Sequence, residues 1–266
     1  MKGIGVHFGP PKERVSLGRN RLLAELPSND FALLEPHLVE KTFDPGTVLQ
    51  QAGEPISRVY FPHSGIISLL GVLPNGDAVD TATIGREGGL GLSAGLGAQT
   101  AFCRAVVQSP SRVSYASALR FAAAAAESKA IREMLVRYGD TLLAQVQQTV
   151  VCNTVHHLQA RLCRWLLHAH DRVEADTLAL TQQFLSGLLG AQRTSITMIS
   201  RLLQAEGIID VRRGRIHIRD LNALERKACS CYRVMRSLTE RNQPQAAEGF
   251  TPPELVNEPS IGIAPD

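Results

Sequence analysis

Apolar residues change their spacing along the chain, and each spacing predicts a different kind of element. Residues 21–41 carry apolar positions at helical intervals and are predicted to be helical. From 42 to 117, short β-type runs alternate with turn residues, which is typical of a β-sandwich or jelly roll. The expected strands are 47–49, 58–61, 66–72, 79–84, 103–108 and 112–116. Asn75-Gly76, between two of these runs, predicts a tight hairpin.

Helical spacing returns after residue 118. The alanine-rich run 122–126 favours a helix, and the apolar residues that follow recur near the 3.5-residue period of a helix packed on another helix. These residues are Ile131, Leu135, Tyr138, Leu142, Val146 and Val150. The spacing fits either an amphipathic helix lying on its own domain or a helix that pairs two copies of the chain. A further amphipathic helix is predicted over 155–170.

The pattern between Thr181 and Arg219 predicts a helix-turn-helix. Ser186 is small where the two helices would cross, and Gly190 falls at the turn, where a positive φ is needed. The inward positions of the two helices are Leu185, Leu189, Ile196 and Ile199. An ordinary helical hairpin is the alternative interpretation.

A basic β-hairpin is predicted directly after these helices. Gly207 ends the second helix, and β-type runs at 208–211 and 216–219 flank a turn that is rich in arginine. A hairpin of this kind is typical of the wing of a winged helix-turn-helix, where it contacts phosphates. The residues expected to do so are Arg212, Arg213 and Arg215.

The early outward residues of the second helix are the candidates for base contact, because the N-terminal part of such a helix enters the major groove. Arg193 can bond a guanine through two hydrogen bonds, which contributes about 1–3 kcal/mol of discrimination. Gln192 is expected to contact adenine or to cap the helix. The remaining outward candidates, with phosphate contact expected of the first three, are Thr194, Ser195, Arg201 and Thr197.

Charge supports this location of the interface. The chain has a net charge of +3, but residues 151–242 hold 14 Lys and Arg against 8 Asp and Glu. The C-terminal part is therefore expected to face a polyanion, which fits double-stranded DNA as partner. An enzyme on the β-rich domain is not expected, because His63 is the one histidine among its strands and no spaced metal or catalytic partner accompanies it.

The five cysteines are expected to be reduced thiols on apolar helix faces, with redox or metal sensing as the alternative. One residue separates Cys229 from Cys231, whereas zinc and redox pairs usually have two residues between them. Four histidines of the 155–170 helix are expected to be solvated: His156, His157, His168 and His170. No metal site is predicted.

The order of a β-rich domain, a long helix and a winged helix-turn-helix resembles the cyclic-AMP receptor protein/Fnr (Crp/Fnr) family of bacterial regulators. The resemblance covers roughly residues 20–240 and is most specific over 180–196, which reads LTQQFLSGLLGAQRTSI. It implies a sequence-specific transcriptional regulator, a homodimer through the long helix, and a guanine contact from Arg193. The family often has a glutamate at the next position, where Thr194 stands here.

The resemblance also implies a cyclic-nucleotide-binding fold for the N-terminal domain, but the phosphate-binding segment departs from the family pattern. Gln99 occupies the place of the arginine that neutralises the cyclic phosphate, and Thr100 follows it. Glu87 corresponds to the early glutamate that holds the ribose. A buried phosphate without a cation is costly to desolvate. The possible ligand contacts are thus Glu87, Gln99 and Thr100, and the ligand is not expected to be a standard cyclic nucleotide.

We therefore predict an α+β protein in five parts. They are a flexible arm at 1–20, a sensor jelly roll at 21–126, a dimerisation helix at 127–153, a winged helix-turn-helix at 154–242 and a disordered tail at 243–266. RNA polymerase is a further expected partner of such a regulator. No secretion signal or membrane span is evident, so a cytoplasmic location is expected. The alternatives are a regulator that needs no ligand and an interaction module that has lost DNA binding.

Overall fold

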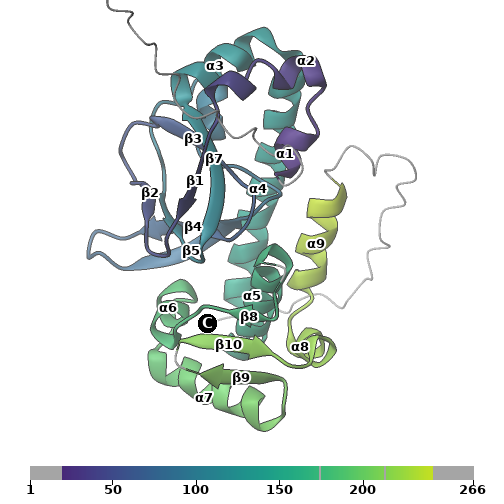
Figure 1. The fold of residues 1–266 in the computed structure, drawn as a ribbon. Helices are drawn as coiled ribbons and strands as arrows, with labels where there is room; N and C mark the ends of the chain where they lie inside the picture. Colours follow the sequence, from purple (N-terminus) through teal and green to yellow (C-terminus); the bar gives the residue numbers. More distant parts are fainter. Residues whose placement is uncertain (1–19, 174, 213, 242–266) are drawn as a thin grey trace, which may run out of the picture.

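The computed structural model describes residues 20–173, 175–212 and 214–241 (Figure 1). Two sheets face each other in the N-terminal domain, one with strand order β1-β7-β3 and one with order β2-β6-β4-β5. Their strands are β1 (Val39–Phe43), β2 (Val48–Gln50), β3 (Arg58–Pro62), β4 (Ile67–Val72), β5 (Ala78–Ile84), β6 (Arg104–Val107) and β7 (Ser111–Ser117). All pairings are antiparallel, and the predicted jelly roll is confirmed.

The first segment of the chain departs from the predicted continuous helix. It forms short helices α1 (Arg21–Ala24), α2 (Ser28–Phe31) and η1 (Glu35–His37), and then β1. Residues 39–41 are extended because β1 pairs with β7, with Glu40 and Arg112 forming a 3.1 Å ion pair between the strands. Leu22, Leu23 and Phe31 are buried and hold these helices on the domain.

Asn20 corrects the predicted boundary of the arm. Its side chain is fully buried, donates to the carbonyl oxygens of Pro62 and Gly88, and accepts from the backbone N–H of Leu23. These bonds explain why the asparagine belongs to the domain and not to a flexible segment. The remainder of the predicted arm, the predicted tail at 243–266 and Arg213 lie outside the described residues.

Helices α3 (Ala118–Glu127) and α4 (Lys129–Val155) follow the jelly roll, and both pack against η2 (Leu92–Leu96). Ser128 separates the two helices, and its hydroxyl accepts from the N–H of Ile131 as the N-cap of α4. Ile131 and Leu135 are buried in the sensor core, against which Tyr138 also packs. Leu142 and Val146 pack on the neighbouring core of the sheets. This face of α4 therefore lies on its own domain.

The C-terminal domain begins with α5 (Leu158–Val173) and contains the small sheet β8-β10-β9. Its other elements are β8 (Thr177–Leu178), α6 (Gln182–Leu188), α7 (Arg193–Ala205), β9 (Ile209–Arg212), β10 (Arg215–Ile218), α8 (Leu221–Lys227) and α9 (Cys231–Arg241). One hydrophobic core joins α5, α6, α7 and the sheet, and includes Trp165 and Leu185. No described helix is long and apolar enough to span a bilayer.

Helices of this domain contact the rest of the chain at several places, two of which show how it is held. Helix α9 lies alongside α4 (Figure 1). Gln148 of α4 donates to the sulfur of Cys231 at 3.0 Å. Helix α5 approaches β5, where the indole N–H of Trp165 donates to Asp80 at 3.3 Å. The predicted winged helix-turn-helix domain thus packs directly against the jelly roll.

Candidate nucleic-acid interface

Helices α6 and α7 form the helix-turn-helix that the sequence predicts. Thr181 caps α6 by accepting from the N–H of Phe184 at 3.1 Å. Gly190 has a φ of 59° at the turn, and the N–H of Ala191 returns to the carbonyl of Ser186 at 2.9 Å. The predicted inward residues are buried, namely Leu185, Leu189, Ile196 and Ile199. The two helices are consequently held as a rigid pair.

The N-terminal end of α7 presents polar side chains to solvent. The exposed residues are Gln192, Arg193 and Thr194, while Ser195 is half-buried. Arg201, two turns further along the helix, is also exposed. Gln192 is the N-cap residue, but its side chain makes no capping hydrogen bond. Arg193 therefore stands at the exposed start of the helix, where its guanidinium has room to reach a base edge.

Thr197, which was predicted to face outward, is half-buried and bonds to both helices of the pair. Its hydroxyl lies 2.7 Å from the side-chain oxygen of Gln182 and 2.9 Å from the carbonyl of Arg193. The first contact joins α7 to the first residue of α6. Thr197 is thus a positioning residue that holds the angle between the two helices.

Strands β9 and β10 form the predicted wing. Arg212 pairs with Arg215 across the hairpin end, and Gly214 between them has a φ of 78°. The side chains of Arg212 and Arg215 are exposed. Oδ2 of Asp210 lies 3.0 Å from Nε of Arg212 and 3.2 Å from Nη2 of Arg219. Hydrogen bonding from Arg219, together with the charge of Arg212, lowers the pKa of Asp210.

The jelly roll encloses a cavity of about 270 Å³ between the β4-β5 sheet, η2 and α4. Apolar side chains dominate its lining, including Leu69, Ile84, Leu90, Leu135 and Leu142. Among the described residues that line it, none is charged. A cyclic phosphate would therefore be desolvated there without a counter-charge.

The structure separates the three predicted ligand residues. Thr100 lines the cavity, whereas the side chain of Gln99 is exposed and Glu87 lies elsewhere. Arg104, the arginine that follows this segment in the sequence, donates to the side-chain oxygen of Gln51 at 3.0 Å and is absent from the cavity lining. The family's nucleotide site is thus not assembled among the described residues.

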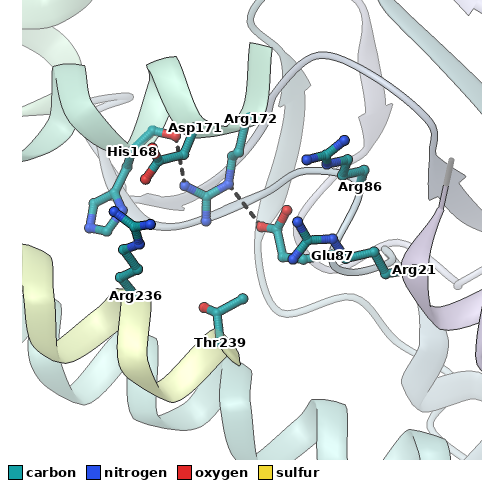
Figure 2. A pocket seen from close by; sticks show the side chains of 8 residues that line it. All are labelled: Arg21, Arg86, Glu87, His168, Asp171, Arg172, Arg236 and Thr239. Carbon is teal, nitrogen blue, oxygen red and sulfur yellow. Dashed lines mark hydrogen bonds and ion pairs between the residues drawn. The ribbon is translucent and has the colours of Figure 1, made fainter. Parts of the chain in front are cut away.

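Glu87 instead belongs to the junction between the two domains (Figure 2). Its carboxylate lies 2.8 Å from Nε of Arg172 on α5 and accepts from the N–H of Gly85. Arg21, Arg86, Arg172 and Arg236 surround a hollow of about 250 Å³ at this junction. Glu87, which was predicted to contact a ribose, thus joins the sensor to the C-terminal domain.

Asp80 forms the second polar contact of the junction. One carboxyl oxygen accepts from Trp165, and the other is buried without a hydrogen-bond partner among the described residues. Burial raises the pKa of Asp80 to about 7. The junction therefore contains a carboxyl group that changes charge near neutral pH.

The structure also gathers four side chains that the sequence left apart. Cys152 and His156 from the end of α4 meet Cys229 and Cys231 from the start of α9, with their ligand atoms all within 4.8 Å of one another. His156 is half-buried and contacts the sulfur of Cys231, and the half-buried His168 packs edge-on against Tyr232, so neither side chain is simply solvated as predicted. The one signal in the sequence was the close spacing of Cys229 and Cys231.

Comparisons with known protein families agree with both domains. Residues 160–227 match the model of the Crp-like helix-turn-helix domain, and residues 40–128 match that of the cyclic nucleotide-binding domain. A comparison with curated protein sequences gave no match.

Several solved structures share this fold. FixK2 from Bradyrhizobium japonicum aligns with a TM-score of 0.63 and 16% identity over 73% of this chain and 98% of its own. A Crp-family transcriptional regulator from Thermus thermophilus aligns with a TM-score of 0.61 and 21% identity over 71% and 96% of the two chains. The c-di-GMP-responsive regulator CLP from Xanthomonas campestris aligns with a TM-score of 0.60 and 15% identity over 73% and 100%.

Proposed function

Because the chain belongs to the Crp/Fnr family of DNA-binding transcriptional regulators, we propose that it binds a two-fold symmetric DNA site as a homodimer and contacts bases through Arg193. The observation that carries this proposal is the exposure of Arg193 at the start of α7, on a helix-turn-helix whose core is complete. Gln192, Thr194, Ser195 and Arg201 flank it and supply further base or phosphate contacts. Thr197 holds α7 against α6.

The wing supplies the second set of DNA contacts. Arg212 and Arg215 stand exposed at the end of the β9-β10 hairpin, where phosphates of the flanking backbone are within reach. Arg212 exchanges its contact with Asp210 for a phosphate when DNA binds. These arginines position the protein, while the preference for particular bases comes from α7.

The dimer forms through the free face of α4. Val136, Leu143 and Val150 are each more than half exposed and are spaced seven residues apart. A seven-residue apolar repeat with β-branched residues favours a parallel pair of helices. Gly139 lies near this stripe, and a Cβ added to it would have no atom within 4 Å. The partner helix can therefore approach closely at this point. Of the predicted seam, the residues from Ile131 to Val146 pack on the sensor, and only its last member, Val150, belongs to the exposed stripe.

The sensor cavity is proposed to take an apolar ligand. Its lining contains Leu, Ile and Tyr side chains with few polar groups, and no cation lies among the described lining residues to balance a phosphate. Standard cyclic nucleotides do not fit this chemistry. Helix α4 forms one wall of the cavity. A ligand would therefore contact the same helix through which the two chains pair.

The protein acts by occupying DNA and contacting RNA polymerase, and it requires no catalysis of its own. The test is selection of binding sites from random DNA with the purified full chain. We expect a near-palindrome with half-sites about one helical turn apart. Cyclic AMP and cyclic di-GMP should leave the selected site and its affinity unchanged.

Arg193→Ala should lower affinity for the selected site by about 1–3 kcal/mol and relax base preference at one position of each half-site. Arg120→Ala, an exposed arginine on α3 far from the interface, is the matched control and should bind as the parent does. Unchanged affinity in Arg193→Ala would remove it from base contact. Absence of saturable DNA binding at low salt would contradict the proposed function as a whole.

A further inference from the structure

Three cysteines and one histidine meet where the dimer helix ends and the last helix begins. Cys152 lies in the final turn of α4, and His156, four residues later, is its C-cap and faces the same side. Cys231 is the first residue of α9, and Cys229 precedes it by two positions. The two pairs are more than 70 residues apart in the sequence, so only the fold brings them together.

The distances within this cluster match those around a tetrahedral metal ion. The sulfurs of Cys152 and Cys229 are 3.5 Å apart, and the sulfur of Cys231 lies 3.5 Å from Nδ1 of His156. All four ligand atoms lie within 4.8 Å of one another. Zn–S bonds of about 2.3 Å place tetrahedral ligands about 3.8 Å apart, so the ligands need only small shifts to enclose the ion.

The donor set is that of a structural zinc site. Three thiolates with one imidazole form a closed four-ligand shell of the kind zinc prefers. A disulfide between Cys152 and Cys229 would use only two of the four groups. It would leave Cys231 and His156 without a reason to converge on the same point.

The surroundings supply what such a shell needs. Gln148, one turn before Cys152 on α4, donates its amide N–H to the sulfur of Cys231 at 3.0 Å, as expected of a group that orients a thiolate ligand. Three thiolates around a divalent ion leave a net negative charge. Arg161 and Arg164 of α5 act electrostatically on Cys152, and Arg164 is 7% exposed with its Nε unpaired among the described residues.

We propose that Cys152, His156, Cys229 and Cys231 bind one Zn²⁺ ion per chain, which clamps the start of α9 to the end of α4. His156 lies two residues before α5, which begins the C-terminal domain. The clamp therefore spans the joint between the dimer helix and the helix-turn-helix. Bound zinc fixes the direction in which each recognition helix leaves the dimer; this consequence rests on the proposed DNA-binding function, whereas the metal site does not.

The first test measures metal directly in the reduced full-length protein. We expect about one zinc per chain after dialysis. Replacement by Co²⁺ should produce the thiolate charge-transfer and d–d absorption bands of a tetrahedral sulfur-rich site. Cys229→Ser and Cys231→Ser should each weaken metal binding at least tenfold, while Cys103→Ser, outside the cluster, should bind as the parent does.

Several results would overturn the site. They are a reduced parent protein that binds no zinc at micromolar concentration, a cobalt spectrum without thiolate bands, or equal loss in Cys103→Ser. Isolation of the protein with a Cys152–Cys229 disulfide that persists in place of zinc, or with iron and sulfide instead, would also contradict it. The parent measurements decide the matter even where a variant fails to fold.

The second test separates the site from its consequence. Removal of zinc by a chelator should weaken binding to the selected DNA site at least tenfold and restore it on zinc addition. Cys163→Ser, a buried cysteine outside the cluster, should respond to the chelator as the parent does. Zinc binding without any DNA binding would leave the metal site standing and contradict the proposed function, and zinc-independent DNA affinity would contradict the clamp alone.

Discussion

Nε of Arg172 lies 2.8 Å from Oε1 of Glu87, and this ion pair joins the first helix of the C-terminal domain to the loop after β5 of the sensor. The two side chains are only 10% and 16% exposed, so water screens their attraction weakly. A second bond from Arg172 reaches the carbonyl of Thr83 in β5. The pair therefore fixes how the recognition helices sit relative to the sensor.

Breaking this pair should loosen the junction. In a double-mutant cycle, Arg172→Gln and Glu87→Gln should show a coupling free energy of about 1–3 kcal/mol in thermal unfolding, because both groups sit in one partly buried network. The Arg112–Glu40 pair, with side chains 30% and 29% exposed, is the matched control and should couple more weakly. Coupling within the 0.3–0.5 kcal/mol typical of independent sites would contradict a structural role for the pair.

The wing arginines should act without regard to sequence. Arg212→Ala and Arg215→Ala should each weaken specific and random DNA alike, and each should reduce the slope of log K against log salt by about 1. Fluorescence titrations across a range of salt concentrations provide the measurement. A loss confined to the selected site, with the slope intact, would mean that these side chains contact bases and not phosphates.

Asp80 should make stability depend on pH. Burial raises its pKa from 3.8 to about 7, so the folded protein keeps a proton that the unfolded chain loses at lower pH. The contribution of Asp80 to stability is then full below pH 3.8 and is lost as the pH rises toward about 7, by about 1.4 kcal/mol for each unit of the shift.

Asp80→Asn should remove this dependence, because the amide stays neutral and its oxygen still accepts from Trp165. Unfolding midpoints should be measured from pH 4 to 8. Those of the parent and of Asp80→Asn should coincide near pH 4, and the variant should have the higher midpoint above pH 7. A parent and a variant with parallel pH profiles would show that Asp80 does not titrate in this range.

Two glycines of the helix-turn-helix should respond oppositely to alanine. Gly190→Ala should cost about 1 kcal/mol, because its φ of 59° is strained for a side chain, although the nearest atom, of Val79, would be 3.7 Å from the new Cβ. Gly187→Ala, in α6 with open space around it, should stabilise by about 0.5–1 kcal/mol. Denaturant unfolding of both variants measures the difference. A Gly190→Ala variant at least as stable as the parent would mean that the turn tolerates alanine.

Local chemistry made much of the fold predictable. Alternating residues placed six strands within one or two positions, since a strand with one buried face must repeat every two residues. The helix-turn-helix was equally accessible, because its small core constrains Leu185, Ile196 and Gly190 at fixed offsets. The 39–41 strand was missed because pairing with β7, and not local preference, determines its conformation.

The same distinction between local patterns and distant contacts applies to the candidate sites. The sequence by itself determined most strands of the jelly roll, the helix with Arg193 and the wing, because each of these elements rests on neighbours a few residues apart. Only the tertiary structure decided that Glu87 joins Arg172, that the exposed face of α4 is the Val136–Leu143–Val150 stripe, and that Cys152 and His156 meet Cys229 and Cys231. Such contacts join residues distant in sequence or depend on which helix face is covered, and packing alone specifies both.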